Sequence, residues 1–370
     1  MTHRTPVLAA VVFLILAACE KSPVGPGSPS IDPLLIRGFS YTSFTSDGFQ
    51  RGHQSGAVDD LLGQTACGWL ALSVFEYQST ATSHDIAPGT TGMNPLDGSP
   101  WPTTATLTDL TAAVADARRN GLKIMLKPHV DLYSGEWRAA IRPDSAWFAS
   151  YRQMILKYAH FAADHGIEIL CIGVEYVVAT QPAFTASWIS LIASIDSVYN
   201  GSLTYAANWS GAYAQGITTP EYLHVGFWSK LDYVGIDMYY PLTYSRDEAI
   251  PSFTTAFARL AASLQQVGSF MSSIGMPMII TEIGIQSVQG ALAEPWNYSI
   301  GSSAGAVEDD AVQELYYRVI LESFGRQIWC RGIFWWNWES VVSLNERTNY
   351  TPRNKPAAAI LRLRYANQPS

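Results

Sequence analysis

Charge is scarce in this sequence. Only 15% of the 370 residues are Asp, Glu, Lys or Arg, against about 25% in an average globular protein. The net charge is −8, and no run of basic residues occurs. The chain therefore lacks the positive surface that phosphate backbones require, and we set nucleic-acid binding aside.

Cysteine and the glycine-rich catalytic motifs are also sparse or absent. The chain has four cysteines, and three of them (Cys67, Cys171 and Cys330) lie beyond the N-terminal segment, so at most one disulfide joins them and we expect most to be buried thiols. Their spacing matches no zinc motif. No GxGxxG, GxxxxGK[ST] or GxSxG occurs, so the sequence lacks the most direct signals of nucleotide-binding enzymes and serine hydrolases. We expect neither a metal nor a cofactor.

The N-terminus has an apolar run, but it is too short to cross a bilayer. Residues 7–18 are uncharged and mostly aliphatic, and Leu16-Ala17-Ala18-Cys19 resembles the bacterial lipobox, whose cysteine becomes lipidated. The stretch SPVGPGSPS (22–30) is typical of a flexible tether. We predict a signal peptide (1–18), a lipidated Cys19 with its tether (19–33) and one folded domain (34–365). An ordinary cleaved signal is the alternative.

Short apolar runs alternate with amphipathic ones along the rest of the chain. The strand-like runs are 36–44, 69–77, 123–130, 168–176, 203–209, 233–240, 278–284 and 332–338. The helical patterns are 107–120, 146–165, 187–199, 254–274 and 311–324. This order predicts a single (β/α)8 barrel, in which the helices after the first and fifth strands have the weakest pattern. An open doubly wound sheet competes, but it would be expected to carry a glycine-rich phosphate turn.

Two of the predicted strands carry a glutamate near their end. Glu175 is the penultimate residue of ILCIGVEY (169–176), and Glu282 lies two residues before the end of MIITEIG (278–284). Catalytic groups of a barrel lie where its strands end, so both carboxyl groups are expected at one mouth. Strict alternation places each glutamate on one face with two residues of its own strand: Cys171 and Gly173 for Glu175, Met278 and Ile280 for Glu282.

Glycoside hydrolysis is typically catalysed by a pair of carboxyl groups that face one cavity. One must hold a proton for the leaving oxygen, while the other attacks the anomeric carbon as an anion. Apolar surroundings raise the pKa of the first, and hydrogen bonds lower the pKa of the second. In the alternative interpretation, each glutamate is tied to an arginine or a backbone amide and has no catalytic role.

The ordered motifs resemble glycoside hydrolase family 113, the β-1,4-mannanases of clan A. They are GLKIMLKPHVD (121–131), GEWRAAI (135–141), LCIGVEY (170–176), LTYAANW (203–209), LDYVGIDMYYPLT (231–243), IITEIG (279–284), GIFWWNWE (332–339) and YTPRNKPA (350–357). The resemblance implies that Glu175 is the general acid/base and Glu282 the nucleophile of a retaining enzyme. Many clan members have Asn before the acid/base, where this chain has Val174.

Further polar and aromatic residues lie at the predicted strand ends. Lys127, His129 and Asp131 alternate at the end of the third strand; we expect Lys127 and His129 to bind sugar hydroxyls, with an internal ion pair or a metal site as alternatives. Asn208 and Trp209 close the fifth strand. Asp237 and Tyr239 share a face near the end of the sixth. We expect Asn208, Trp209 and Asp237 to contact the sugar as well.

Aromatic rings are expected to line the cleft. By resemblance to the clan, Tyr239 hydrogen-bonds the nucleophile, although its neighbour Tyr240 is an alternative. We expect Trp336 to stack beneath the reacting sugar. The remaining tryptophans in predicted loops are candidate platforms along a polymer groove, or seals over hydrophobic clusters: Trp101, Trp137, Trp228 and Trp296.

These observations combine into one functional hypothesis. It is a monomeric, endo-acting, retaining β-1,4-mannanase that cleaves mannan or glucomannan and is held to a bacterial membrane, outside the cytoplasm, only by its N-terminal lipid. The same chemistry on glucan or xylan is the nearest alternative. A surface lipoprotein that binds glycans without cleaving them is a second.

Overall fold

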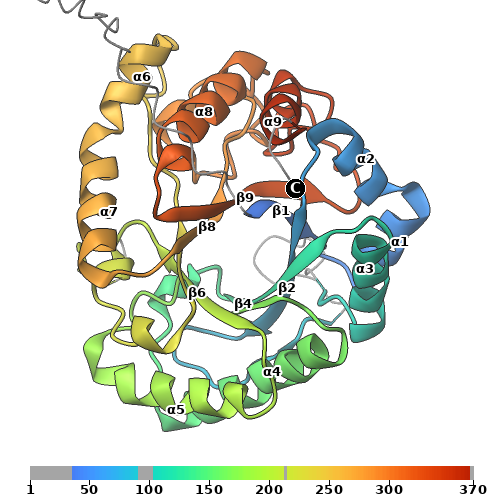
Figure 1. Ribbon diagram of the computed structural model, residues 1–370, viewed down its shortest axis with the longest axis vertical. Helices are drawn as coiled ribbons and strands as arrows, with labels where there is room; N and C mark the ends of the chain where they lie inside the picture. The colour runs from blue at the N-terminus through green and yellow to red at the C-terminus, as the bar shows by residue number, and fades with distance from the viewer. Residues whose placement is uncertain (1–35, 91–102, 212–214, 367–370) are drawn as a thin grey trace, which may run out of the picture. The chain divides into compact units, whose positions relative to one another are not determined.

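The computed structural model describes residues 36–90, 103–211 and 215–366, all within one compact unit, Asp32–Ser370. The predicted signal peptide, Cys19, the tether and Trp101 lie outside these residues. Figure 1 shows the strands as an inner ring with the helices around it. The strands are β1 (Ile36–Thr42), β2 (Trp69–Gln78), β3 (Ala87–Pro88), β4 (Lys123–Leu132), β5 (Ile169–Val174), β6 (Ser202–Asn208), β7 (Tyr233–Asp237), β8 (Met278–Ile283) and β9 (Cys330–Glu339).

Pairing between strands closes the ring. The nine-stranded sheet runs β1-β9-β8-β7-β6-β5-β4-β2-β3, and β1 also pairs with β2. Of these nine described strands, the two-residue β3 pairs antiparallel with β2, and the other eight pair in parallel. The predicted (β/α)8 barrel is therefore confirmed, and the open sheet is excluded.

Helices form in all five predicted intervals, and three further helices of the described residues lie outside them. They are α1 (Gly48–Ser55), α2 (Ala57–Thr65), α3 (Leu107–Arg119), α4 (Ser145–Asp164), α5 (Thr185–Asp196), α6 (Phe253–Arg259), α7 (Ala261–Ile274), α8 (Asp310–Glu322) and α9 (Pro356–Ala366). The run 254–274 is divided between α6 and α7. In the described residues between β6 and β7, the connection contains only the short 3-10 turns η3 (Glu221–Leu223) and η4 (Trp228–Lys230).

Local sequence sets several helix boundaries. Thr106 and Asp144 cap α3 and α4 by accepting the backbone N–H of the third residue of each helix. The chain leaves both helices through glycines in the left-handed region, Gly121 (φ 69°) and Gly166 (φ 58°). The sequence pairs Asn120-Gly121 and His165-Gly166 are typical of such helix ends.

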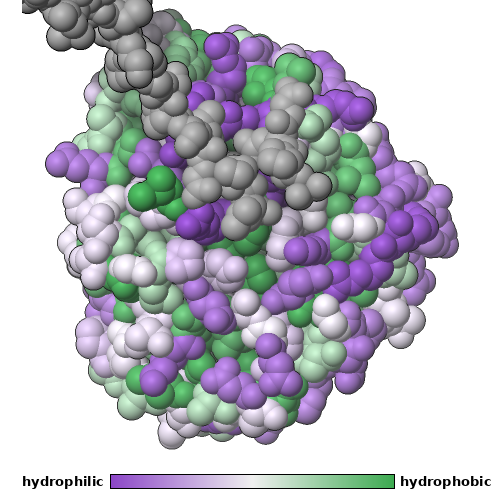
Figure 2. Space-filling view, viewed as in Figure 1, coloured by the Kyte–Doolittle hydropathy of each residue, from purple (hydrophilic) through white to green (hydrophobic). Residues whose placement is uncertain are grey.

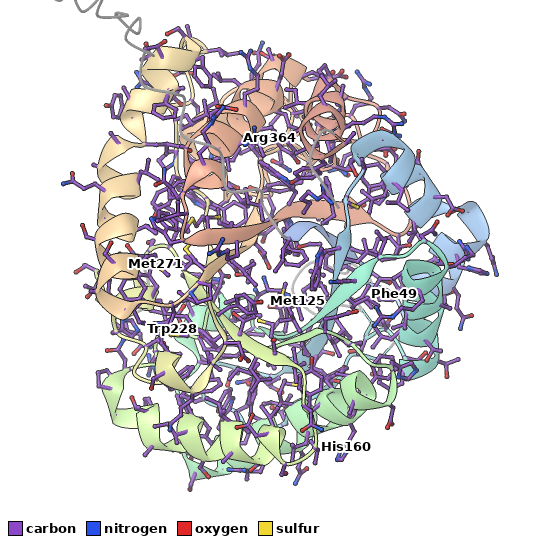
Figure 3. The ribbon with its side chains drawn as sticks, viewed as in Figure 1. Phe49, Met125, His160, Trp228, Met271 and Arg364 are labelled. Carbon is purple, nitrogen blue, oxygen red and sulfur yellow. The ribbon has the colours of Figure 1, made fainter. Side chains whose placement is uncertain are left out.

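The hydrophobic core has two layers. A small cluster fills the barrel and includes Met125, and a much larger one packs between strands and helices and includes Phe49, Trp228 and Met271. Figure 3 shows Met125 inside the ring and the other three outside it, between the strands and the outer rim of the molecule. The three described cysteines (Cys67, Cys171 and Cys330) are free and buried. Across the described ranges, no helix has both the length and the apolar character needed to cross a membrane.

Candidate active site

Glu175 lies immediately after β5 in an unusual backbone conformation. Its φ is +55°, in the left-handed region that few residues other than glycine adopt and that costs about 1–2 kcal/mol. Its backbone N–H donates to the carbonyl of Ala206 on the neighbouring strand at 2.8 Å. The surrounding sheet thus holds this strained residue at the carboxyl end of the barrel.

Strict alternation does not explain how Glu175 reaches the mouth. The pairing of β5 with β6 shifts register between Cys171 and Val174, both of which lie in the inner cluster. Gly173 instead approaches the outer layer, where a Cβ atom would lie 2.7 Å from Cε2 of Tyr205. The predicted common face of Cys171, Gly173 and Glu175 is therefore wrong, and an irregularity of β5 directs the carboxyl group.

The same correction applies to β8. Ile279 belongs to the inner cluster, whereas Met278 and Ile280 pack in the outer one. The pairing of β8 with β9 shifts register between Ile280 and Ile283. Met278, Ile280 and Glu282 therefore do not share a face as predicted, because the strand changes its pleat just before Glu282.

Glu282 is bound by an ammonium group and a phenol. Lys127 Nζ lies 2.5 Å from its Oε1 atom, and the Tyr239 hydroxyl donates to Oε2 at 2.9 Å. Tyr240, the sequence alternative to Tyr239, stacks its ring on Phe324 in the outer layer. These two donors fix the orientation of the Glu282 carboxylate.

Lys127 and Asp237 form an ion pair beneath Glu282. Lys127 Nζ lies 3.1 and 3.2 Å from the two Asp237 oxygens, and Thr281 Oγ1 donates to Oδ1 of the aspartate at 2.6 Å. Both charged side chains are fully buried. They are therefore internal partners of Glu282, whereas we had expected them to contact sugar.

The carboxylates of this group stabilise the charge of Lys127, whereas they repel each other. Burial alone would lower the pKa of Lys127, but the carboxylates of Asp237 and Glu282 outweigh it and raise that pKa, so the amine stays charged. Burial, followed by the charge of Glu282, raises the pKa of Asp237 well above its ordinary value, although Lys127 opposes this shift. The single ammonium group is thus shared by two carboxyl groups.

Glu175 has a different set of partners. Asn208 Nδ2 donates to Oε1 at 2.6 Å, and Trp137 Nε1 and Arg138 Nη1 approach Oε2 at 3.3 and 3.4 Å. Burial raises the pKa of Glu175; the Arg138 charge opposes this shift, and the Glu282 charge adds to it. Glu282 is therefore close enough to influence Glu175, and the two carboxyl groups lie in distinct environments.

His129 is a buried, neutral side chain beside Glu282. Its Nε2 atom lies 3.9 Å from Glu282 Oε1, and neither ring nitrogen has a hydrogen-bond partner among the described residues. Burial lowers the pKa of His129 well below its ordinary value, and the charges of Arg138 and Lys127 add to this shift. The imidazole therefore retains one free donor and one free acceptor.

The aromatic residues divide between cleft and core. Trp336 is partly exposed and lies 6.4 Å from His129 between ring centroids, while Trp335 and Trp338 are buried. Trp209 packs against Trp296 at 5.7 Å, and Trp296 and Trp137 are 39% and 37% exposed. Trp228 is buried in the outer core, so its prediction as a loop platform is wrong.

Comparison with known proteins decides the family. The model of Glycoside Hydrolase Family 113 matches residues 39–353. The chain belongs to glycoside hydrolase family 113. It is therefore a glycoside hydrolase, in agreement with the resemblance seen in its motifs.

Solved structures share the fold of this family 113 chain. One described as a GH113 beta-1,4-mannanase has a TM-score of 0.74 at 21% identity, covering 90% of this chain and 99% of that one. The GH113 beta-mannanase from Alicyclobacillus acidocaldarius has a TM-score of 0.71 at 24% identity, covering 91% and 98%. A β-glucuronidase from Ruminococcus gnavus has a TM-score of 0.54 at 12% identity, covering 90% and 50%. No curated protein sequence matches the chain.

Sequence reasoning missed three polar neighbours of the family 113 glutamates. Arg138, Thr281 and Glu221 were not predicted as site residues, although Arg138 lies in the quoted motif GEWRAAI and Thr281 precedes Glu282. The available signal for Arg138 was its position next to Trp137, just beyond a predicted strand end, in a chain with few charges. For Glu221, which lies in a loop, no comparable pattern exists.

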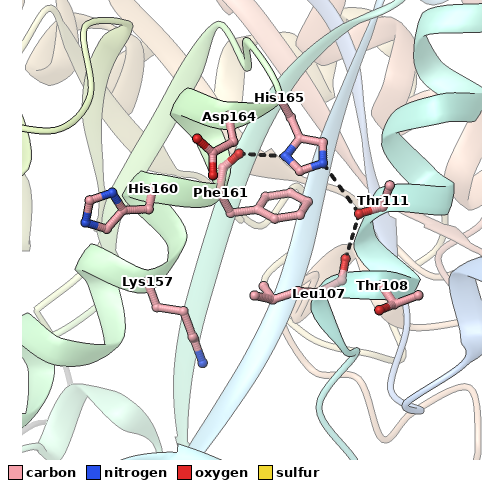
Figure 4. Close-up of a pocket in the computed structure, with 8 residues that line it drawn as sticks. All are labelled: Leu107, Thr108, Thr111, Lys157, His160, Phe161, Asp164 and His165. Atoms are coloured by element: carbon pink, nitrogen blue, oxygen red, sulfur yellow. Dashed lines mark hydrogen bonds between the residues drawn. The ribbon is translucent and has the colours of Figure 1, made fainter.

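Other features of the family 113 barrel lie away from the glutamates. A hollow between α3 and α4, on the outer wall, is lined by Leu107, Thr108, Thr111, Lys157, His160, Phe161, Asp164 and His165 (Figure 4). His165 there bonds the carbonyl of Phe161 at 2.9 Å.

Within the described ranges, no three His, Cys, Asp or Glu side chains are placed to hold a metal ion. Asp131, weighed as a ligand with His129, accepts from Arg138 at 2.8 Å.

Proposed function

We propose that this glycoside hydrolase is a retaining, endo-acting β-1,4-mannanase, with Glu175 as general acid/base and Glu282 as nucleophile. The contrast between the two carboxyl groups carries the proposal. Glu282 accepts from an ammonium group and a phenol, as suits an anionic nucleophile. Glu175 is buried and has a raised pKa, as suits an acid that must hold a proton.

The first step forms a glycosyl-enzyme. A Glu282 oxygen attacks the anomeric carbon while Glu175 gives its proton to the departing glycosidic oxygen, so one C–O bond forms as the other breaks. The positive charge of Lys127 remains beside Glu282 throughout. Its partner Asp237 keeps the ammonium group in place while the negative charge of Glu282 is consumed in the new ester.

The second step releases the sugar. Glu175, now ionised, accepts a proton from a water molecule that attacks the same anomeric carbon, and the bond to Glu282 breaks. Arg138 and Asn208 both approach the Glu175 carboxylate and stabilise its charged form. Configuration is retained because the carbon is inverted twice.

Sugar binding is assigned to groups with free capacity at the mouth. Partly exposed Trp336 offers a face for the C–H groups of a ring. His129 lies 6.4 Å from it between ring centroids, but its side chain is buried and its ring nitrogens have almost no exposed surface, so they do not reach a sugar at the mouth as predicted. Trp137 contacts Glu175 directly, which assigns it to the side of the leaving group. Asn208 holds Glu175 and lies close to the reacting sugar.

An extended substrate is supported by the outer aromatic pair. Trp209 and Trp296 continue from Asn208 toward the exterior, where Trp296 is 39% exposed. Platforms beyond the reacting sugar favour internal cleavage of a chain. Mannan as the polymer is supported by the similar structures described as beta-1,4-mannanases.

Product analysis tests this proposal. Mannohexaose should give mixed internal-cleavage products with the β-anomer formed first, as read by NMR, and mannan should be cleaved faster than xylan or carboxymethylcellulose. Glu282→Gln and Glu175→Gln should each lose at least about 1000-fold in kcat/KM. Glu76→Gln is the matched control, because Glu76 is a buried glutamate bound by Lys157 and Tyr158 rather than by the site. Mannan binding without product release, or full activity in either site variant, contradicts the proposal.

Location and assembly are also proposed. A signal peptide over 1–18 and a lipid on Cys19 would place the catalytic domain, 34–365, outside the cytoplasm as a tethered monomer. Metabolic labelling with a fatty acid should mark the wild type and not Cys19→Ala, which should leave the membrane fraction. Light scattering of the catalytic domain should give the monomer mass.

A further inference from the structure

Another buried glutamate, Glu221, lies behind Glu175 and has no part in the two chemical steps. Glu221 begins η3 in the loop between β6 and β7, and its side chain is fully buried. We propose that Glu221 is a positioning residue that holds the Glu175 carboxyl group in place to protonate the leaving group. This inference rests on the proposed function, in which Glu175 is the acid/base.

One connection runs through Asn208. The Oε2 atom of Glu221 accepts the backbone N–H of Asn208 at 2.7 Å, and Asn208 Nδ2 donates to Glu175 Oε1 at 2.6 Å. Asn208 is the last residue of β6, where the strand gives way to a loop. Glu221 therefore fixes the backbone of the residue that binds the acid/base most closely.

The other connection runs through Tyr205. Its hydroxyl donates to Oε1 of Glu221 at 2.6 Å and accepts the backbone N–H of Tyr176 at 2.8 Å. Tyr176 directly follows Glu175, whose left-handed φ of +55° requires support from its surroundings. Glu221 thus holds the chain beyond Glu175 as well as the side chain in front of it.

Two neighbouring residues complete the support. Thr180 Oγ1 donates to the same Oε1 atom of Glu221 at 2.9 Å. Gly173 leaves room for the Tyr205 ring, since a Cβ atom there would lie 2.7 Å from that ring. The ring is packed on its other sides by Trp188 and Phe227, so the Tyr205 hydroxyl has little freedom to move.

A carboxylate suits this place because it accepts on both sides at once. Glutamine has a single acceptor oxygen, so it can keep the bond from Asn208 or the bonds from Tyr205 and Thr180, but not both sets. Burial raises the pKa of Glu221, and the bonds from Asn208, Tyr205 and Thr180 oppose this shift because all three are donated to its carboxylate oxygens. Glu221→Gln therefore changes little volume and selectively weakens one connection to Glu175.

Comparison of two leaving groups tests the inference. Mannohexaose needs a proton from Glu175 for its first step, whereas 2,4-dinitrophenyl β-mannotrioside releases a stable phenolate without one. We expect Glu221→Gln to lower kcat/KM on mannohexaose by about 10- to 100-fold, since small misplacement of a catalytic group costs on that order. The loss on the aryl substrate should be under about threefold, because its departure needs no acid.

Two further variants keep the test decisive. Tyr205→Phe removes the bridge to Tyr176 while keeping the ring, and should show the same unequal loss even where Glu221→Gln does not fold. Glu76→Gln, the buried-glutamate control, should match the wild type on both substrates. Equal losses on the two substrates, or no loss on either, would overturn the positioning role of Glu221. If the wild type still cleaves mannohexaose in that case, the proposed mannanase function stands. A wild type inactive on both substrates would overturn the proposed function and this inference together.

Discussion

The ammonium nitrogen of Lys127 lies 2.5 Å from Oε1 of Glu282, and the same nitrogen lies 3.1 Å from Asp237. Neither Lys127 nor Asp237 has any exposed side-chain surface. One cation is therefore shared by two carboxyl groups at a depth where neither it nor Asp237 has any exposed surface.

Loss of Lys127 should damage both stability and activity. Lys127→Met leaves two buried carboxyl groups without a cation, so we expect the free energy of unfolding in urea to fall by about 3–5 kcal/mol. Hydrolysis of mannohexaose should fall by at least about 100-fold in kcat/KM. Lys127→Met/Asp237→Asn should regain part of the stability but none of the activity. Lys123→Met, at the exposed start of the same strand, is the control and should change neither quantity.

Arg138 should set the alkaline limit of activity. Its charge lowers the pKa of Glu175 against the larger effect of burial. Arg138→Met should therefore raise that pKa and keep the acid protonated to higher pH. The alkaline limb of the kcat/KM profile should move to higher pH. Arg118→Met, whose partner Glu168 lies at the opposite end of the barrel strands, should leave the limb in place. A downward shift in Arg138→Met would contradict the assignment of Glu175 as the acid.

The hydroxyl of Tyr239 should contribute to the chemical step. A hydrogen bond to a charged group is worth about 1.5–3 kcal/mol, so Tyr239→Phe should lower kcat/KM by about 10- to 100-fold. Tyr240→Phe is the matched control, because this neighbouring hydroxyl belongs to the outer layer and does not contact Glu282. Steady-state kinetics on mannohexaose would measure both. Equal losses in the two variants would mean that Tyr239 acts only through packing.

Lys355 should make stability depend on pH. Burial lowers its pKa from 10.5 to about 7, despite nearby Asp310, Glu346 and Glu339. Between about pH 7 and 10.5 the unfolded chain binds a proton that the folded protein does not, so this group makes stability rise with pH there. Below the folded pKa both states are protonated, and the cost of burying the charge is fully present.

Replacement of Lys355 by an apolar residue tests that sign. At about 1.4 kcal/mol per unit of pKa shift, Lys355→Met should stabilise the protein by about 2–4 kcal/mol at pH 6 and flatten the rise above pH 7. Urea unfolding at pH 6, 8 and 9.5 would measure this. The carbonyl of Asn349, which accepts from Lys355 Nζ at 3.3 Å, would still accept the backbone N–H of Ser287 in this variant. Lys230→Met, at an exposed position, should change stability by less than about 0.5 kcal/mol.

The barrel was predictable because its strands are long apolar runs with clear ends. The run 278–284, for example, became β8, Met278–Ile283. The connection after β6 differs because its turns are held by distant partners, such as Tyr205 and Asn208 for Glu221, rather than by a helical repeat. Periodicity therefore describes the strands and most helices, but not this loop.

The sequence predicts where the two glutamates lie along their strands, but not which way their side chains point. A carboxylate behind an apolar strand is visible in the sequence, whereas the register shifts that turn Glu175 and Glu282 into the mouth are not. Asp237 was expected to meet sugar because it ends a strand, yet its neighbour Lys127 holds it below the surface. Arg138 reaches Glu175 across 37 positions of sequence, a contact that only the folded chain brings about.

The direction of β1 has a consequence for how the enzyme would meet its polymer. The strand begins at Ile36 and runs parallel to its neighbours toward Thr42, so the chain enters at the floor of the barrel while both glutamates open at its roof. The attachment point proposed at Cys19 precedes β1 in the sequence, so a tether would join the barrel at its floor. The roof, with both glutamates, would remain free to receive a glycan chain.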